Sequence, residues 1–257
     1  MRRLAAALAC FLLAACAGGP PIDTSYRSVG QDSRVMFLVL HFTNEDFPRS
    51  LRILTQGRVS SHYLVAESPP TIYRLVDESR RAWHAGLSSW KGNTQLNASS
   101  IGIEIVNMGL QGPVAIDSFA DYPPEQIDAV IELCKDIVKR HGIPPERVVG
   151  HSDIAPQRKV DPGPKFPWHR LAQAGLVLWP KAETVAERLP AFRQQLPDVS
   201  WFQQQLALHG FAVPANGELD DATRKVIRAF QMKYRPARFD GEPDAETAAL
   251  LDALVRP

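Results

Sequence analysis

The sequence has few cysteines and no surplus of charge of either sign. Three cysteines occur in 257 residues, and 29 lysines and arginines against 28 aspartates and glutamates give a formal net charge of +1. A nearly neutral chain has no electrostatic reason to bind a polyanion, so we expect no nucleic-acid partner. With 45% hydrophobic and 22% charged residues the chain can bury a core, and its length suffices for two domains.

The sequence also lacks an apolar run long enough to cross a membrane as a helix. The run from Leu4 to Ala15 has twelve residues, whereas a spanning helix needs about 20. It follows the cationic start Met1–Arg3, and this combination is typical of a secretory signal. The run ends in the residues Leu13–Cys16, which resemble the end of a bacterial lipoprotein signal.

The lipoprotein resemblance bears on location and on the use of the cysteines. It implies cleavage before Cys16 and lipidation of that residue, and Ala17 in the next position implies the outer membrane, with the protein facing the periplasm. The alternative is an ordinary secretory signal with an incidental cysteine. Cys10 would leave with the signal, so Cys134 would remain alone and no disulfide framework could form. Its place on an apolar helix face predicts a buried, unreactive thiol.

We predict five segments along the chain. They are a lipoprotein signal at 1–16 with Cys16 as the mature N-terminus, a tether at 17–34, a catalytic domain at 35–180, a linker at 181–197 and a small helical domain at 198–257. In the catalytic domain, apolar runs of strand length at 35–40 and 101–106 are interspersed with a helix pattern at 124–142. This alternation predicts a mixed α/β layer structure.

Two histidines and an aspartate stand out in the predicted catalytic domain. His41 follows an apolar strand directly, His151 follows a second short strand, and Asp161 comes ten residues after His151. Two histidines and a carboxylate, with a fourth position open, form a ligand set of catalytic zinc, which activates water and polarises a carbonyl. From the spacing alone, histidines with purely structural hydrogen bonds are the default interpretation.

Three segments carry a family resemblance. They read HSDIAPQRKVDPGPKFPW at 151–168, SSIGIE at 99–104 and AWHAG at 82–86. In this order they resemble the zinc N-acetylmuramoyl-L-alanine amidases of the AmpD-like (amidase type 2) family, over about 35–179. The resemblance implies a mixed β-sheet flanked by helices, as in peptidoglycan recognition proteins. It also implies hydrolysis of the amide between N-acetylmuramic acid and L-alanine in peptidoglycan or muropeptides.

The resemblance assigns roles to five residues. His41, His151 and Asp161 match the ligands of one Zn²⁺ per chain. Glu104 matches the residue that takes a proton from the attacking water and passes it to the leaving amine, and a glutamate among isoleucines also needs a polar cavity to face. Lys159 matches a cation that stabilises the oxyanion. The alternatives are a rim glutamate on a half-exposed strand and a solvated loop lysine.

Three further residues are candidates for substrate binding. Trp83 and His84 match the family's substrate groove, and Arg81 can pair with a carboxylate of the stem peptide. A purely structural role is the alternative for each of them.

The C-terminal segment contains an internal repeat, in which GELDDAT at 217–223 is echoed by GEPDAET at 241–247. With Gly210-Phe211 and the residues 229–231, it resembles a three-helix peptidoglycan-binding domain, although Asn216 stands where that family has an aspartate. Such a domain raises the local enzyme concentration on an insoluble polymer. Two rival functions remain: a non-catalytic peptidoglycan-recognition lipoprotein, and a zinc peptidase that cuts elsewhere in the stem peptide.

Overall fold

The computed structural model describes residue 20 and residues 22–256, so the predicted signal and the lipidated Cys16 lie outside the described residues. The chain divides into two compact units, Met1–Asp32 and Ser33–Pro257. The described part of the first unit contains no helix or strand, and residues 22–32 are all exposed. Among the described residues, no helix combines the length and apolar character that a membrane span requires.

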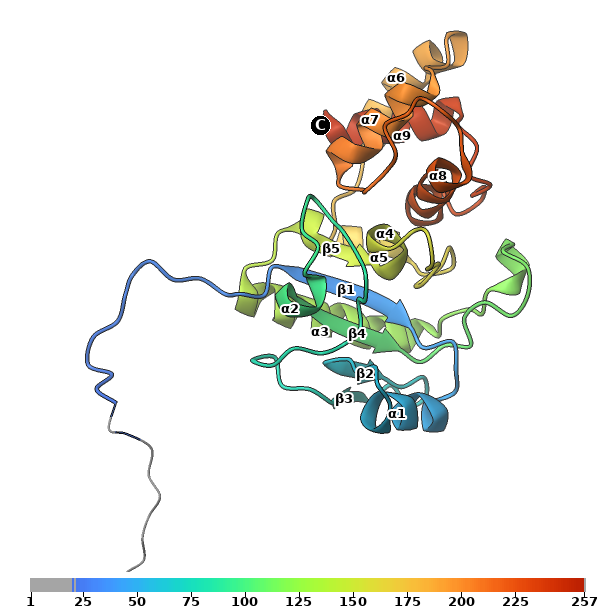
Figure 1. The fold of residues 1–257 in the computed structure, drawn as a ribbon. Helices are drawn as coiled ribbons and strands as arrows, with labels where there is room; N and C mark the ends of the chain where they lie inside the picture. The colour runs from blue at the N-terminus through green and yellow to red at the C-terminus, as the bar shows by residue number, and fades with distance from the viewer. Residues whose placement is uncertain (1–19, 21, 257) are drawn as a thin grey trace, which may run out of the picture. The chain divides into compact units, whose positions relative to one another are not determined.

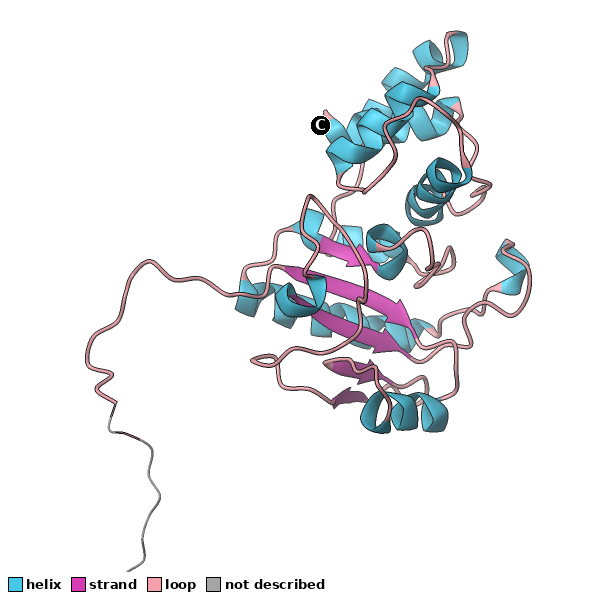
Figure 2. Ribbon diagram, in the orientation of Figure 1, coloured by secondary structure: helices cyan, strands magenta, loops and turns pink. Residues whose placement is uncertain are grey.

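The second unit contains a five-stranded mixed sheet (Figure 2). Its strands are β1 (Phe37–Phe42), β2 (Tyr63–Val65), β3 (Ile72–Arg74), β4 (Ser100–Ile105) and β5 (Val148–Gly150), in the order β3-β2-β4-β1-β5. The pair β2–β3 is antiparallel and the other neighbours are parallel. Helices flank this sheet, which confirms the predicted fold class.

The two faces of the sheet pack against different partners. Leu38 and Leu40 of β1 share a hydrophobic cluster with isoleucines of β4 and with α3 (Pro124–His141), whose course along the sheet Figure 1 shows. Because side chains alternate along a strand, Phe37 and Val39 point to the opposite face and belong to another cluster. His41 points to that second face as well. The free Cys134 is buried on α3, as predicted.

Short helices complete the sheet-containing part of the unit. They are α1 (Phe47–Gln56), α2 (Leu96–Ser99), α4 (His151–Ile154) and α5 (Trp168–Gln173), with 3₁₀ turns at Ile116–Ser118 and Pro145–Arg147. A further helix, α6 (Ala182–Gln194), packs instead against α9 (Ala245–Val255), where Arg188 pairs with Asp252 at 2.6 Å. The N-cap Asp46 starts α1 by accepting a hydrogen bond from the Arg49 N–H at 2.9 Å. Helix α3 begins at a proline and ends at Gly142, whose φ of 65° suits a helix C-cap.

The C-terminal part consists of α7 (Val199–His209), α8 (Asp221–Tyr234) and α9 (Ala245–Val255). The repeat seen in the sequence is also a repeat in structure. Gln203 of α7 accepts the N–H of Gly217 at 2.9 Å, and Gln231 of α8 accepts the N–H of Gly241 at 2.8 Å. Both glycines have positive φ, 73° and 82°. Each buried glutamine therefore holds the glycine turn that leads into the next helix.

The departure from the expected pattern at Asn216 leaves this turn intact. Asn216 Oδ1 accepts the N–H of Glu218 at 3.0 Å, and Asp240 Oδ1 accepts the N–H of Glu242 at the same distance. Asparagine and aspartate both form this type of turn, so the amide replaces the carboxylate without a change of backbone geometry.

One hydrophobic core extends from the sheet into the three C-terminal helices. Its cluster joins Phe37 and Val149 of the sheet to Phe202, Phe230 and other buried residues of α7, α8 and α9. Trp90 is almost fully buried there, with its ring 5.0 Å from that of Phe211. The sheet and the C-terminal helices are thus packed together and do not merely follow one another along the chain.

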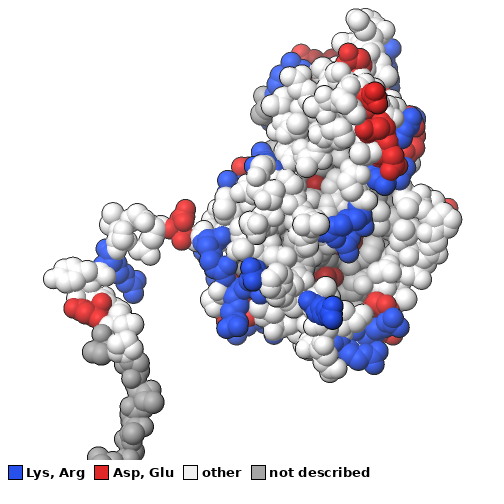
Figure 3. Space-filling view, viewed as in Figure 1, with Lys and Arg blue, Asp and Glu red and all other residues white. Residues whose placement is uncertain are grey.

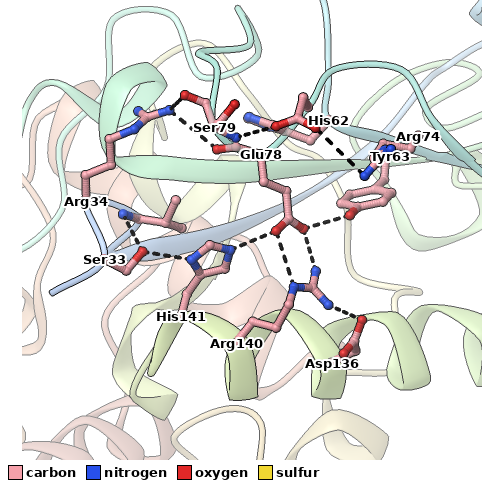
Figure 4. Close-up of polar contacts among 12 residues, drawn as sticks. Ser33, Arg34, His62, Tyr63, Arg74, Glu78, Ser79, Asp136, Arg140 and His141 are labelled. Atoms are coloured by element: carbon pink, nitrogen blue, oxygen red, sulfur yellow. Dashed lines mark hydrogen bonds and ion pairs between the residues drawn. The ribbon is translucent and has the colours of Figure 1, made fainter. Parts of the chain in front are cut away.

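A polar cluster fixes the beginning of the second unit (Figure 4). Glu78 accepts hydrogen bonds from Tyr63 at 2.7 Å, from Arg140 at 2.5 Å and from His141 at 2.8 Å. The other ring nitrogen of His141 lies 2.7 Å from Ser33 Oγ. The carboxylate therefore joins the C-terminal turn of α3 to a loop and, through His141, to the first residue of the unit.

Charged side chains on the surface occur in small groups of both signs, separated by uncharged areas on the face that Figure 3 shows. Along the helices, opposite charges pair, as in Lys135–Glu132 at 2.8 Å and Lys225–Asp221 at 2.7 Å. Exposed pairs of this kind contribute little to stability.

Candidate active site

Two histidines and one aspartate converge on a point at the edge of the sheet. Nδ1 of His41, Nδ1 of His151 and Oδ2 of Asp161 lie 2.9 to 3.1 Å from one another, and all three residues are buried. Ligand atoms of a tetrahedral zinc are spaced by roughly 3.3 Å when each bond is about 2.0 Å. The triangle of donor atoms therefore has the size that a small divalent cation requires.

The parallel sheet brings the three residues together. In the register of β1 with β5, Leu40 lies opposite Gly150, so the next residues, His41 and His151, come side by side. Asp161 is attached to the same turn because the Ser152 N–H donates to its carbonyl at 2.8 Å. Strand pairing thus brings together His41 and Asp161, which lie 120 residues apart in the sequence.

Hydrogen bonds to the outer ring nitrogens select the histidine tautomers. His151 Nε2 lies 3.2 Å from the Ala85 carbonyl, which can only accept, so Nε2 carries the proton and Nδ1 is free for a metal. His41 Nε2 lies 3.0 Å from His84 Nδ1. A proton on His41 Nε2 leaves Nδ1 of this ring free as well. Both tautomers, assigned from the network, suit metal binding.

The chain of hydrogen bonds continues behind His84. Its Nε2 lies 3.1 Å from Ser100 Oγ, and the Ser100 hydroxyl donates to the Leu96 carbonyl. Asn97 Oδ1 accepts the backbone N–H groups of His84 and Ala85 at 3.0 and 2.8 Å. His84 is therefore held on all sides beside His41.

The protonation states suit a cation. Burial, followed by the neighbouring His151, lowers the pKa of His41 to about 4, so this ring is neutral at pH 7. Burial alone would raise the pKa of Asp161, but the two histidines outweigh burial and hold the pKa well below its usual range. An ionised carboxylate and neutral imidazoles are the forms that bind metals.

Glu104 and Lys159 line the same cavity as the ligands. Glu104 lies opposite His41 in the β1–β4 register, and its Oε2 is buried without a hydrogen-bond partner among the described residues. Burial and, after it, the charge of Asp161 raise the pKa of Glu104 against the opposing charge of Lys159, and together they bring it to about 8. A free carboxylate oxygen in a cavity beside a metal site can accept a proton from a reacting group.

Apolar and aromatic side chains form the rest of the cavity wall. Trp83 is half exposed and lines the cavity with Ile53, Val59 and His84. The Arg81 guanidinium lies over the Trp83 ring, 3.9 Å from its centroid. The Trp83 ring gives the cavity an aromatic wall suited to a sugar or a peptide, and Arg81 packs on that ring.

The comparison with protein families agrees with this geometry. The Amidase_2 family, N-acetylmuramoyl-L-alanine amidase, matches residues 31–164, and the PG_binding_1 family of peptidoglycan binding domains matches residues 195–251. The N-acetylmuramoyl-L-alanine amidase AmiD of Escherichia coli K12 is 45% identical over 262 residues, which cover 96% of this chain and 95% of AmiD. The chain belongs to the N-acetylmuramoyl-L-alanine amidase family. The predictions of family, amidase activity and peptidoglycan as partner are confirmed.

Solved structures of two relatives superpose over nearly the whole chain. E. coli AmiD in complex with the substrate anhydro-N-acetylmuramic acid-L-Ala-D-γ-Glu-L-Lys has a TM-score of 0.82 and 44% identity, and the match covers 91% of this chain and 93% of AmiD. AmpDh3 of Pseudomonas aeruginosa in complex with anhydromuramic pentapeptide has a TM-score of 0.84 and 42% identity, with 92% and 98% covered.

The sequence did not identify every residue of this amidase site. Arg158 donates to the carbonyls of Ala85 and Leu87, and Asn97 and Ser100 support His84. Arg158 and Ser100 lie within the quoted family segments and Asn97 lies two residues before one of them, but an arginine, an asparagine and a serine are too common in loops to signal a role by themselves. These residues hold the backbone and the rings that present the ligands.

Proposed function

We propose that this amidase binds one zinc ion through His41, His151 and Asp161 and uses it to cut the amide between N-acetylmuramic acid and L-alanine. The observation that carries the proposal is the triangle of donor atoms, 2.9 to 3.1 Å on each side, in a cavity that also holds Glu104 and Lys159. Zinc in such a site lowers the pKa of water to about 7 and polarises a carbonyl.

Glu104 is the proposed proton carrier. Its free Oε2 faces the cavity, and its raised pKa lies close to neutral pH, where a carboxylate can both accept and release a proton. It takes the proton of the attacking water and delivers it to the nitrogen of L-alanine as the amide breaks. The neighbouring strand holds it in register with His41, so the distance to the reacting centre is fixed.

Lys159 is the proposed oxyanion partner. It precedes Asp161 by two residues and is only partly exposed at the cavity wall. An ammonium group there stabilises the negative charge that develops on the carbonyl oxygen during attack.

We propose Arg81 and Trp83 as substrate contacts at the rim, where the indole can stack on a sugar ring and the guanidinium can pair with a stem-peptide carboxylate. His84 lines the cavity too, but its contacts with His41 and Ser100 favour a role in orienting the metal ligand. The substrate class is a muropeptide or peptidoglycan strand that contains the N-acetylmuramic acid–L-alanine bond. The complex of AmiD holds such a muropeptide, and that of AmpDh3 holds anhydromuramic pentapeptide.

We further propose that Cys16 carries a lipid anchor and that the tether at 17–34 presents the enzyme at the periplasmic face of the outer membrane. The domain boundaries at 35–180, 181–197 and 198–257 belong to the same proposal. The three C-terminal helices would hold the enzyme on the polymer and raise the local substrate concentration.

The rival functions make different demands on the site. A recognition protein without activity has no need for a complete ligand set and a buried carboxylate in one cavity, and this chain has both. A zinc peptidase would use the same residues on another amide of the stem peptide, so only the reaction product separates it from the amidase.

The test is incubation of purified protein with muropeptides, with and without a chelator, and identification of the products by mass spectrometry. We expect a free stem peptide that begins with L-alanine, no product after chelation, and recovery on addition of zinc. Intact muropeptides in the presence of zinc would refute the proposal. Cleavage within the stem would identify the zinc peptidase instead.

A further inference from the structure

One lysine of the C-terminal helices reaches the strand and helix that carry His151. Lys233 of α8 is buried, and its Nζ lies 2.8 Å from Asp153 Oδ2, 3.4 Å from the Val148 carbonyl and 4.2 Å from the centroid of the Trp168 ring. The exposed fraction of the side chain is 5% for Lys233 and 1% for Asp153. All three partners of the ammonium group belong to the sheet-containing part of the unit.

The partner carboxylate is placed beside a metal ligand. Asp153 lies two residues after His151 in α4, and its Oδ2 also accepts the N–H of Gly150 at 2.8 Å. One carboxylate oxygen therefore joins Lys233 to the N–H of Gly150, the residue that immediately precedes His151. Because the first N–H groups of a helix have no partner within the helix, this hydrogen bond fixes how α4 begins.

Because the Lys233–Asp153 ion pair is buried, loss of either partner destabilises the other. A buried carboxylate that loses its cation is left with an uncompensated charge, and such a residue moves toward water or changes its hydrogen bonds. Either movement would release Gly150 and rotate the start of α4. The Trp168 ring and the Pro162 ring pack so closely on Gly150 that an added Cβ would lie 3.1 Å and 2.7 Å from them, so the turn has little alternative space.

Other contacts hold α7 and α8 against the same region. Gln157 donates to the Ala222 carbonyl at 3.0 Å, at the first turn of α8. The Lys91 N–H donates to the Gly210 carbonyl at 2.9 Å, and Trp90 packs edge-on against His209, with ring centroids 5.6 Å apart. The position of Lys233 is thus set by an extended interface.

We propose that Lys233 is a positioning residue for the metal ligand His151, acting through Asp153 and Gly150. The three C-terminal helices are then part of the framework of the metal centre, in addition to any hold on the polymer. The inference rests on the proposed zinc site, but it concerns how well the chain's own ligands are held.

The experiment compares zinc affinity in the full-length wild type, Lys233→Met, Asp153→Asn and the double variant, by competition with a chromogenic chelator. Lys225→Met is the matched control, since this lysine of α8 forms only a partly exposed pair with Asp221. We expect Lys233→Met to weaken zinc binding about 10- to 100-fold, the range for losses of outer-shell support. The Lys225→Met control should bind zinc as tightly as the wild type does. The visible spectrum of the cobalt-substituted protein should change in Lys233→Met and stay unchanged in Lys225→Met.

The double variant protects the test against a folding defect, because it has no unpaired buried carboxylate. If Lys233 and Asp153 act as one unit, the double variant should bind zinc at least as tightly as the single variant with the lower affinity. Wild-type affinity and an unchanged cobalt spectrum in folded Lys233→Met would overturn the proposal, as would additive losses in the double variant. Unfolding of both Lys233 variants would also overturn it, since the pair would then serve global folding. Failure of the wild type to bind zinc would instead refute the proposed function.

Discussion

His41 Nε2 lies 3.0 Å from His84 Nδ1, and the two rings meet edge to face at 87°. The contact uses the nitrogen of His41 that points away from the metal site. It therefore sets both the tautomer and the orientation of His41, a proposed zinc ligand, while Ser100 and Asn97 hold His84 from behind.

Replacement of His84 by alanine should loosen the metal. His41 would lose the acceptor for its Nε2–H, and its ring could rotate. We expect zinc affinity to fall about 10- to 100-fold, measured by chelator competition, with the amidase rate at saturating zinc reduced much less. His169→Ala, a change at an exposed histidine, is the control, and equal affinities in the two variants would contradict the role of His84.

Gly102→Ala should disturb the same His41–His84 contact by displacing the His84 ring. A Cβ at Gly102 would lie 2.5 Å from Cγ of His84, a ring held on all sides. Overpacking of this kind costs about 1–3 kcal/mol, so we expect a lower midpoint of thermal unfolding and weaker zinc binding. Addition of His84→Ala should restore much of the stability but not the zinc affinity. A stable Gly102→Ala protein with normal zinc binding would show that His84 can move freely.

Glu104→Gln should separate metal binding from catalysis. The amide keeps the shape of the side chain but cannot shuttle a proton, so we expect kcat to fall by about 10²- to 10⁴-fold while zinc content stays at one ion per chain. Metal analysis and muropeptide turnover measure the two properties. Glu125→Gln, at an exposed position of α3, should leave both unchanged. Normal turnover in Glu104→Gln would refute the assignment of the proton carrier.

The Glu78 cluster should make stability depend on pH in the acid range. Burial alone would raise the pKa of Glu78, but hydrogen bonds from Arg140, Tyr63 and His141 outweigh burial and lower the pKa from 4.5 to about 2. Because the folded-state pKa is the lower one, this stabilisation is complete above about pH 4.5 and is lost as the pH falls toward 2.

Glu78→Gln should therefore unfold more easily than the wild type at pH 7, by about 1–2 kcal/mol once solvent screening is allowed for. The difference should shrink between pH 4.5 and 2, the window set by the two pKa values. Denaturant unfolding at several pH values measures it. A difference that stays constant over this range would mean that the charge of Glu78 contributes nothing.

The sequence predicted the parts of the site that local patterns record. The alternation at 101–105 placed Glu104 on the face opposite the isoleucines, and the family motifs pointed to His41, His151 and Asp161, whose donor atoms the structure brings together. The structure adds the register that sets Glu104 beside His41, which depends on strand pairing over more than 60 residues. The contact of Lys233 with Asp153 could not be predicted, because the two residues lie 80 positions apart and a lysine in an amphipathic helix is normally solvated.

The hydrophobic core that contains both Phe37 and Phe230 limits which domains of this enzyme can be exchanged. A graft that exchanged residues 198–257 for another wall-binding domain would uncover Trp90 and Val149 unless the newcomer carried matching apolar side chains. Evolution and protein engineering must therefore change the two halves in concert, and chimeras joined within α6 should aggregate more than chimeras joined upstream of Ser33.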